Sequence, residues 1–421
     1  MLNRVAFRSA FVRIASPLLP GVLLVILVSV QQPWWSVREF NQDEGFNLGK
    51  AALYHAGFDL YRDIWNDQPP ILTVALAALQ NLFPADVGAA RALILLSAVL
   101  LLACLFRLAR RFHGPVVAWT ATLLLVFSSL FQLLSVSVLI GLPAIALATL
   151  ALDLATTRWP RAWIGCLAAG VVYALALHTK LFVLPMLPAF VLGCWATSPR
   201  RGRAAAIGGF LATAVLAYLA VVWALAIPVG GSLLAPHVAP SLRAGYSASR
   251  NFDAFFDTFR RFLLLGIAYA ASLFWIPARA RSVANLVPLS WAVSGAAVLM
   301  LHTPLWSHQF LLVIIPACWC AAIFIEAAIR WATSAAQLRR IAVFALLFAG
   351  IVAALVNQGQ TLSRPSRYEQ TLPSVARQIL RYWEPGDWTF CDRALFPCGR
   401  RRPAGDRRQF GKADRSGQPA G

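Results

Sequence analysis

Charged residues are scarce in this chain of 421 residues. Only 13% are Asp, Glu, Lys or Arg, whereas a soluble globular domain is typically about a quarter charged. Acidic residues number 17, and lysine occurs only at Lys50, Lys180 and Lys412. Hydrophobic residues make up 59% of the chain and the mean hydropathy is +0.66, so little polar surface is left for a domain in water. The composition excludes a soluble protein and indicates a membrane protein.

Cysteine spacings typical of metal sites are also missing. Five of the seven cysteines lie inside apolar runs, and none belongs to a paired spacing of the zinc-binding type. The other two, Cys391 and Cys398, lie in an atypical C-terminal segment, where a disulfide between them is left open. The formal charge of +20 does not indicate nucleic acid, because most basic residues form short clusters between apolar runs. Membrane lipids, and no nucleic acid, are the expected surroundings.

Apolar runs of about 17–25 residues, the length of a membrane-crossing helix, recur along the chain. The first run, near Ile14–Val30, lacks a convincing cleavage site and continues into an aromatic belt at Pro33–Trp35, so we interpret it as a retained helix. We expect an all-α polytopic membrane protein with about eleven transmembrane helices. They are expected near residues 14–35, 88–108, 115–134, 136–157, 162–179, 181–198, 204–228, 261–278, 284–301, 309–329 and 341–357.

Arginine clusters between these runs predict the orientation. The clusters are Arg4/Arg8/Arg13, Arg107/Arg110/Arg111, Arg158/Arg161, Arg200/Arg201/Arg203, Arg279/Arg281 and Arg330/Arg339/Arg340. All of them fall on the cytoplasmic side only if the short run Ile71–Phe83 does not cross the membrane. We therefore predict a transmembrane domain over residues 1–357 of the inner membrane, with residues 36–86 as one periplasmic loop containing juxtamembrane helices. The N-terminus is then cytoplasmic and the C-terminal tail, residues 358–421, periplasmic.

Two further external loops are expected. Residues 230–260 form the second periplasmic loop, and its phenylalanines have the three-to-four-residue spacing of an interfacial helix. These phenylalanines are Phe252, Phe255, Phe256 and Phe259. The shorter loop His302–Gln309 contains two of the six histidines.

Acidic residues concentrate in the first loop. The segment Asn41–Pro70 contains five of the 17 acids: Asp43, Glu44, Asp59, Asp63 and Asp67. Ionisable groups are costly in a membrane protein, and they indicate function when they cluster. Five carboxylates just outside the bilayer predict a reaction site at the membrane surface.

Three segments, in chain order, carry a resemblance to a known family. They are DEGFNLGKAALYHAGFDLYRDIWNDQPPILT at Asp43–Thr73, ALHTKLFVLPM at Ala176–Met186, and Ser307–Phe310 ahead of Pro316. Together they resemble the glycosyltransferase C superfamily, and most nearly glycosyltransferase family 39, the protein O-mannosyltransferase and aminoarabinose transferase group. The three segments span most of the chain.

This resemblance implies a membrane enzyme that takes a sugar from a polyprenyl-phosphate donor. The lipid lies between helices, and a hydroxyl of a lipid, glycan or protein acceptor attacks the anomeric carbon, usually with inversion. Such chemistry needs a carboxylate to accept the proton of the acceptor and cations or dipoles to hold the departing phosphate. No nucleotide or redox cofactor is implied.

Asp43 and Glu44 match the acidic pair of the family. Adjacent side chains point about 100° apart on a helix, so the two are expected to have separate tasks. We predict that Asp43 is the base and that Glu44 supports the loop or the acceptor. The alternative for Asp43 is that of a helix N-terminal cap.

The other expected site residues contact the donor. Asp63 positions the sugar, or else forms a surface ion pair with Arg62. Gln68 precedes Pro69-Pro70 where the family commonly has Lys or His, and it can hydrogen-bond a phosphate without supplying charge. The candidates for the missing cation are Arg62, Lys180, Arg243 and Arg250, and His308 is a further candidate for contact with the phosphate.

Each of these cations also has a simpler interpretation. Lys180 can be a lysine that extends to the membrane interface, the two arginines of the second loop can be solvated, and His308 can be satisfied locally. No metal site is predicted, although a single divalent ion on Asp43 and Asp63 is left open, since hard cations usually need more ligands.

Two other functions are kept as alternatives. A transporter or flippase for lipid-linked sugars would place ionisable residues near the middle of the bilayer, whereas the acids here lie in a loop. A non-catalytic, degenerate family member is the second alternative, because of Gln68 and the unusual C-terminal segment.

The segment from about Cys391 onward is rich in Arg, Gly and Pro, lacks apolar periodicity and is predicted to be disordered. One hypothesis is an out-of-frame translation of GC-rich DNA. Translation of the gene in the other two frames is then expected to reveal an ending with regular apolar patterning. The absence of such an ending from both frames would remove the hypothesis.

Overall fold

The computed structural model describes residues 15–31, 33–35, 40–41, 43–64, 66, 68–84, 86–159, 162–225, 227, 252–253, 255–257, 263–279, 282–302 and 305–333. By its internal contacts the chain divides into two units, residues 1–366 and 367–421. All described residues belong to the first unit. Arg243, Arg250, Asp67 and the expected helix at 341–357 lie outside the described residues.

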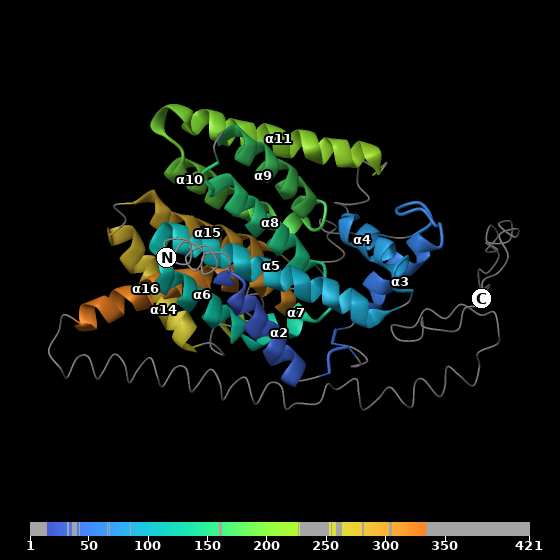
Figure 1. The fold of residues 1–421 in the computed structure, drawn as a ribbon, viewed down its shortest axis with the longest axis horizontal. Helices are drawn as coiled ribbons and strands as arrows, with labels where there is room; N and C mark the ends of the chain where they lie inside the picture. Colours follow the sequence, from blue (N-terminus) through green and yellow to red (C-terminus); the bar gives the residue numbers. More distant parts are fainter. Residues whose placement is uncertain are drawn as a thin grey trace, which may run out of the picture. The chain divides into compact units, whose positions relative to one another are not determined.

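The described part of the chain is built from α-helices (Figure 1). They are α2 (Leu19–Gln31), α3 (Asp43–His55), α4 (Ile71–Gln80), α5 (Val87–His113), α6 (Pro115–Val126), α7 (Ser129–Ser135), α8 (Gly141–Thr156), α9 (Ala162–Leu177), α10 (Leu187–Thr197), α11 (Arg203–Ala224), α14 (Leu263–Arg279), α15 (Leu286–Leu301) and α16 (Leu311–Thr333). Short 3-10 turns precede four of them: η1 (Leu181–Met186), η2 (Arg200–Gly202), η4 (Val283–Asn285) and η5 (Ser307–Phe310). The expected all-α class is confirmed.

Four described helical segments are long and apolar enough to cross a membrane: Val87–His113, Arg200–Ala224, Val283–Leu301 and Ser307–Ala332. The bent pair of α6 and α7 is a fifth candidate. Several shorter apolar helices accompany them, among them α2, α8 and α9. The chain is thus a polytopic membrane protein, while the expected number of eleven spans stays a prediction.

The core forms where α16 and α5 pack against their neighbours. α16 contacts α6, α14 and α15, whereas α5 contacts α6 and α8. In the apolar window of α16, 78% of the residues are buried, against 11% in that of α11. α16 is therefore central, and α11 lies at the edge of the bundle, with Leu216 and Trp223 exposed (Figure 1).

The expected single helix over 115–134 is wrong. α6 ends at Val126, and α7 begins at Ser129 after a bend of 72°. Ser128 caps α7 by accepting a hydrogen bond from the N–H of Phe131 at 3.4 Å. The side-chain amide of Gln132 donates to the carbonyl of Val126 at 2.7 Å, which satisfies a buried acceptor left by the break. The next helix consequently starts at Gly141, not at residue 136.

The described arginine clusters predicted to be cytoplasmic lie at one end of the bundle. Arg107 and Arg111, in the last turns of α5, bind the buried carboxylate of Asp153 near the end of α8, at 3.0 and 2.8 Å. α11 begins at the same end, because it follows the reversal of direction between α10 and η2, where Arg200 and Arg201 lie. The described arginine clusters fit the predicted topology, although the orientation itself stays a prediction.

The first loop forms two short helices at the opposite end. α4 has ten residues, so it is about 15 Å long, roughly half of the bilayer core. The N–H of Ile71, at its start, donates to the carbonyl of His178 at 3.0 Å, just after α9 ends. α3 and α4 therefore lie beside the helix ends that are farthest from the arginine clusters (Figure 1). Juxtamembrane helices in this loop were expected from the sequence.

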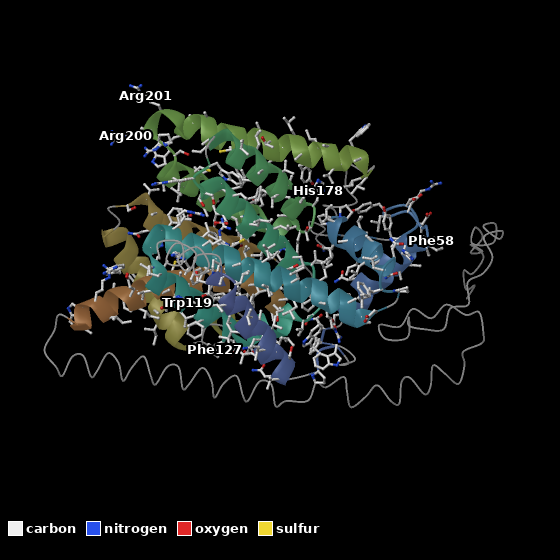
Figure 2. All side chains as sticks on the ribbon, viewed as in Figure 1. Phe58, Trp119, Phe127, His178, Arg200 and Arg201 are labelled. Carbon is white, nitrogen blue, oxygen red and sulfur yellow. The ribbon has the colours of Figure 1, made fainter. Side chains whose placement is uncertain are left out.

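Labelling of single cysteines tests the proposed sidedness. Phe58 in the first loop and Arg201 before α11 are both exposed, and they lie at opposite sides of the view in Figure 2. The five described native cysteines are buried, so a background with Cys391→Ser and Cys398→Ser is expected to be unreactive. We expect a membrane-impermeant maleimide to label Phe58→Cys in intact spheroplasts and Arg201→Cys only after lysis. Labelling of both positions before lysis would contradict the predicted topology.

Candidate functional site

Asp43 and Glu44 at the start of α3 point in different directions. Asp43 is exposed, whereas Glu44 is 2% exposed. The side-chain oxygen of Asn41 accepts the backbone N–H of Asp43 at 3.0 Å, and the Asn41 carbonyl accepts that of Glu44 at 3.1 Å. Asn41 thus caps this end of α3. The separation of the two carboxylates is confirmed, and Asp43 is the one that faces outward.

Glu44 forms a buried ion pair with Arg91 of α5. The guanidinium donates from Nε to Oε1 at 3.1 Å and from Nη2 to Oε2 at 2.9 Å, and the side chains are 1% and 3% exposed. Both oxygens also accept a backbone N–H, from Val138 at 2.9 Å and from Phe40 at 2.8 Å. A carboxylate bound in this way holds chain segments together. This arrangement fits the loop-supporting role expected of Glu44 and not contact with a substrate.

The same contacts tie α3 to two other parts of the chain. Asn47, one turn after Glu44, donates to the carbonyl of Val138 at 2.8 Å. Arg91 also donates to the carbonyl of Trp34 at 2.8 Å. We call Glu44, Asn47, Arg91 and Val138 the α3 anchor. It fixes α3 against α5 and against the loop between α7 and α8.

The sequence analysis missed Arg91, although a signal was present. A fully buried arginine four residues into a long apolar helix is expensive unless it is paired and hydrogen-bonded. Its position near the start of the apolar run suggested a residue at the membrane interface. Only the structure shows which carboxylate it pairs with.

A second network organises the turn at Gln68. Lys50 of α3 donates from Nζ to Oδ1 of Asn66 at 3.1 Å, and the Asn66 amide donates to the carbonyl of Gln68 at 2.8 Å. The hydroxyl of Tyr61 donates to the same carbonyl at 2.9 Å. Tyr61 has a φ of +70°, a left-handed conformation that costs about 1–2 kcal/mol for a residue other than glycine. The turn before Pro69 and Pro70 is therefore held directly by Tyr61 and Asn66, and indirectly by Lys50 through Asn66.

Arg62 and Asp63 lie at the exposed tip of the loop. Arg62 pairs with Asp59 at 3.8 Å, with the two side chains 82% and 67% exposed. Asp63 accepts the backbone N–H of Asp59 at 2.9 Å. The surface ion pair of Arg62 thus has Asp59 as its partner, not Asp63, and it contributes little to stability at this exposure. Both contacts are local contacts of a turn.

Three basic side chains from two loops form a basic cluster. Lys180 precedes η1, and His302 and His308 flank the short connection between α15 and η5. Lys180 and His302 lie within Coulombic range of the His308 ring. The ammonium of Lys180 is 5.0 Å from the ring centroid of Phe182. Lys180 supplies a positive charge here, and the partly buried imidazole of His308 can donate a hydrogen bond to an anion.

The basic cluster is joined to the turn at Gln68 through His178, whose carbonyl accepts the N–H of Ile71. The His178 ring is stacked on that of Tyr218, with centroids 4.1 Å apart, and its Nε2 lies 2.9 Å from the carbonyl of Tyr218. Because a carbonyl only accepts, Nε2 carries the proton. His178, labelled in Figure 2, is a structural link between α4, α9 and α11. His302 and His178 were not singled out from the sequence.

No group of three or more His, Cys, Asp or Glu side chains able to hold a metal ion occurs in the part of the chain that the structure describes.

The short segment with Phe252, Phe255 and Phe256 is helical at the described positions 252–253 and 255–257. Phe255 lies 5.7 Å from Phe310, ring centroid to ring centroid, so this segment contacts η5 next to His308.

Comparison with known proteins gives similar folds. No protein-family profile and no curated protein matches the sequence. The oligosaccharyltransferase of Archaeoglobus fulgidus in its apo form is similar over 89% of this chain and 59% of its own, with 14% identity and a TM-score of 0.62. ArnT of Cupriavidus metallidurans bound to undecaprenyl phosphate is similar over 86% of this chain and 72% of its own, with 16% identity and a TM-score of 0.57.

A further structure of the archaeal oligosaccharyltransferase, tethered to an acceptor peptide, has 13% identity and a TM-score of 0.53 over 85% of this chain. This chain spans about three fifths of the length of the archaeal protein. At these identities the likeness shows the fold alone: this chain folds like the archaeal oligosaccharyltransferase and ArnT. The resemblance found in the sequence is confirmed at this level.

A double-mutant cycle tests the α3 anchor. Glu44→Gln and Arg91→Met each leave a buried group without its partner, so each is expected to lower the free energy of unfolding by about 3 kcal/mol. The double variant is expected to lose clearly less than the sum. Thermal unfolding in detergent measures all three. If Glu44→Gln kept the unfolding temperature but abolished turnover, Glu44 would be a catalytic residue and not a supporting one.

Proposed function

We propose that this chain, which has the fold of the glycosyltransferase C superfamily, is an integral-membrane glycosyltransferase of the inner membrane that uses a polyprenyl-phosphate-linked hexose or pentose. The acceptor is a lipid, a cell-envelope glycan or a protein at the periplasmic face. Proteins of similar fold support these classes, since ArnT was solved with undecaprenyl phosphate and an oligosaccharyltransferase with an acceptor peptide.

One observation carries the proposal: an outward-facing carboxylate and a cluster of basic side chains occur at the same end of the bundle. Asp43 begins α3, whose next residue is bound to the loop before α8. Lys180 and His308 lie where α9 ends and α16 begins, and these helix ends lie at the same side as the start of α8. The reaction needs a carboxylate that accepts the proton of the acceptor, and basic side chains that hold the departing phosphate.

In the proposed reaction the hydroxyl oxygen of the acceptor forms a bond to the anomeric carbon. The bond between that carbon and the phosphate oxygen breaks, and the polyprenyl phosphate leaves with the electron pair. The proton of the hydroxyl passes to the carboxylate of Asp43. Attack opposite to the leaving phosphate inverts the configuration at the anomeric carbon. The bond that forms replaces the one that breaks, so no redox cofactor is required.

The other expected residues are assigned to the donor. Lys180 and His308 bind the phosphate, and Gln68 donates a hydrogen bond from the edge of the same region. Asp63, Arg62, Arg243 and Arg250 remain proposals for contact with the sugar or the phosphate. Glu44 supports Asp43 through the α3 anchor. A divalent cation at Asp43 is tested by adding a chelator to the transfer assay.

Asp43→Asn is expected to lower transfer by about 10²–10⁴-fold, because the amide cannot accept the proton. The assay measures the release of undecaprenyl phosphate from sugar-linked undecaprenyl phosphates in detergent, with membrane lipid extract as the source of acceptor. Asp59→Asn is the matched control, since it removes an exposed acid of the same loop that pairs with Arg62. Unchanged turnover in Asp43→Asn would remove Asp43 from the mechanism.

The same assay separates the enzyme from a transporter. Joining of sugar to acceptor in detergent, where no sealed compartment exists, requires an enzyme. A purified protein that moves a fluorescent sugar lipid across vesicles but joins nothing in detergent would favour the flippase. Analysis of envelope lipids and glycans from a deletion strain identifies the sugar and the acceptor together.

A further inference from the structure

Lys50 is one of three lysines in the chain, and it lies on α3 with the outward-facing Asp43. The two are seven residues apart, which is nearly two full turns of an α-helix. Their side chains therefore leave the helix within about 20° of each other and about 10 Å apart along its axis. The positive group of Lys50 is partly buried, whereas Asp43 is exposed.

The position of the Lys50 ammonium is set by Asn66. Asn66 is 4% exposed, and its amide group is oriented by hydrogen bonds with Gln68 and Lys50, one of them from the backbone N–H of Gln68 to Oδ1 at 3.4 Å. Its Nδ2 donates to the carbonyl of Gln68 at 2.8 Å, and its Oδ1 accepts from Lys50 at 3.1 Å. The ammonium is thus one side chain away from the Gln68 backbone. An ammonium has three N–H donors and can bind more than one acceptor at once.

Two lysines are connected to the turn at Gln68. Lys50, on α3, is connected to it through Asn66. In the second connection, Ile71 is bonded to His178, two residues before Lys180. Arg62, the other described cation of this loop, is 82% exposed and paired with Asp59 at the tip. Lys50, which lies 18 residues before Gln68, was not among the cations considered from the sequence.

We propose that Lys50 binds the phosphate of the polyprenyl-phosphate donor and supplies the positive charge that the neutral Gln68 lacks. This inference rests on the proposed function. Asn66 is the positioning residue, since it holds the ammonium beside the turn. A partly buried cation binds a phosphate more strongly than a solvated one, because the effective dielectric constant there is lower. Lys50 and Lys180 then both contact the phosphate.

Binding of undecaprenyl phosphate to the purified full-length chain in nanodiscs tests this role without requiring turnover. Lys50→Gln keeps an N–H donor for Asn66 but removes the charge, and it is expected to weaken binding about tenfold or more. Lys50→Arg keeps the charge and is expected to bind within about threefold of the wild type. Raising the salt concentration is expected to weaken wild-type binding more than that of Lys50→Gln. Arg330→Gln, at the opposite end of the bundle, is the control for loss of one charge.

The outcomes are distinct. Equal binding by the wild type and Lys50→Gln would overturn the role of Lys50 and leave the proposed function intact. Equal weakening of Lys50→Gln and Lys50→Arg would also overturn it, because charge would then not matter. A matching loss of binding to phosphatidylglycerol would show a general contact with anionic lipid and overturn it as well. No binding of undecaprenyl phosphate by the wild type would overturn the proposed function itself.

Discussion

The buried pair of Glu44 and Arg91 is the interaction on which the arrangement of the site depends. Placing two charges in an apolar bundle is favourable only if each finds its partner and further hydrogen bonds. Glu44 has both, since Arg91 and two backbone N–H groups bind its oxygens. With Glu44 turned inward, the helix geometry turns its neighbour Asp43 outward. The burial of Glu44 thus fixes the direction of Asp43, whose carboxylate is exposed at the start of α3.

The first loop is held at both ends by contacts with the bundle. At the start of α3 the α3 anchor joins it to α5 and to the loop before α8. At the start of α4 the backbone of Ile71 is bonded to His178. Between these points the loop is held by its own side chains, with Asn66 and Tyr61 bound to the carbonyl of Gln68. Rigid placement of a loop that carries polar groups is what precise chemistry at a bilayer surface requires.

Much of the fold follows from apolar length and charge position. The all-α class, a first-loop helix too short to cross the membrane and the different directions of Asp43 and Glu44 were all predicted from local rules. The long-range hydrogen-bond partners of the site residues were not predicted. Arg91 lies 47 residues from Glu44, and Lys50 lies 16 residues from Asn66, so no periodicity links them. The break between α6 and α7 was missed because continuous apolar sequence hides it, and only Ser128 and Gln132 mark it.

The long sequence separation of these contacts has a consequence for biosynthesis. Val138 follows Glu44 by 94 residues, and a ribosome adds about 5–20 residues per second. For about 5–20 s the newly made α3 therefore has no α7–α8 loop to bind. Val138, made after the bend that follows α6, then supplies both partners. Its backbone N–H binds Glu44, and its carbonyl binds Asn47. The first loop is therefore completed late, by a residue that is made after α5, α6 and α7.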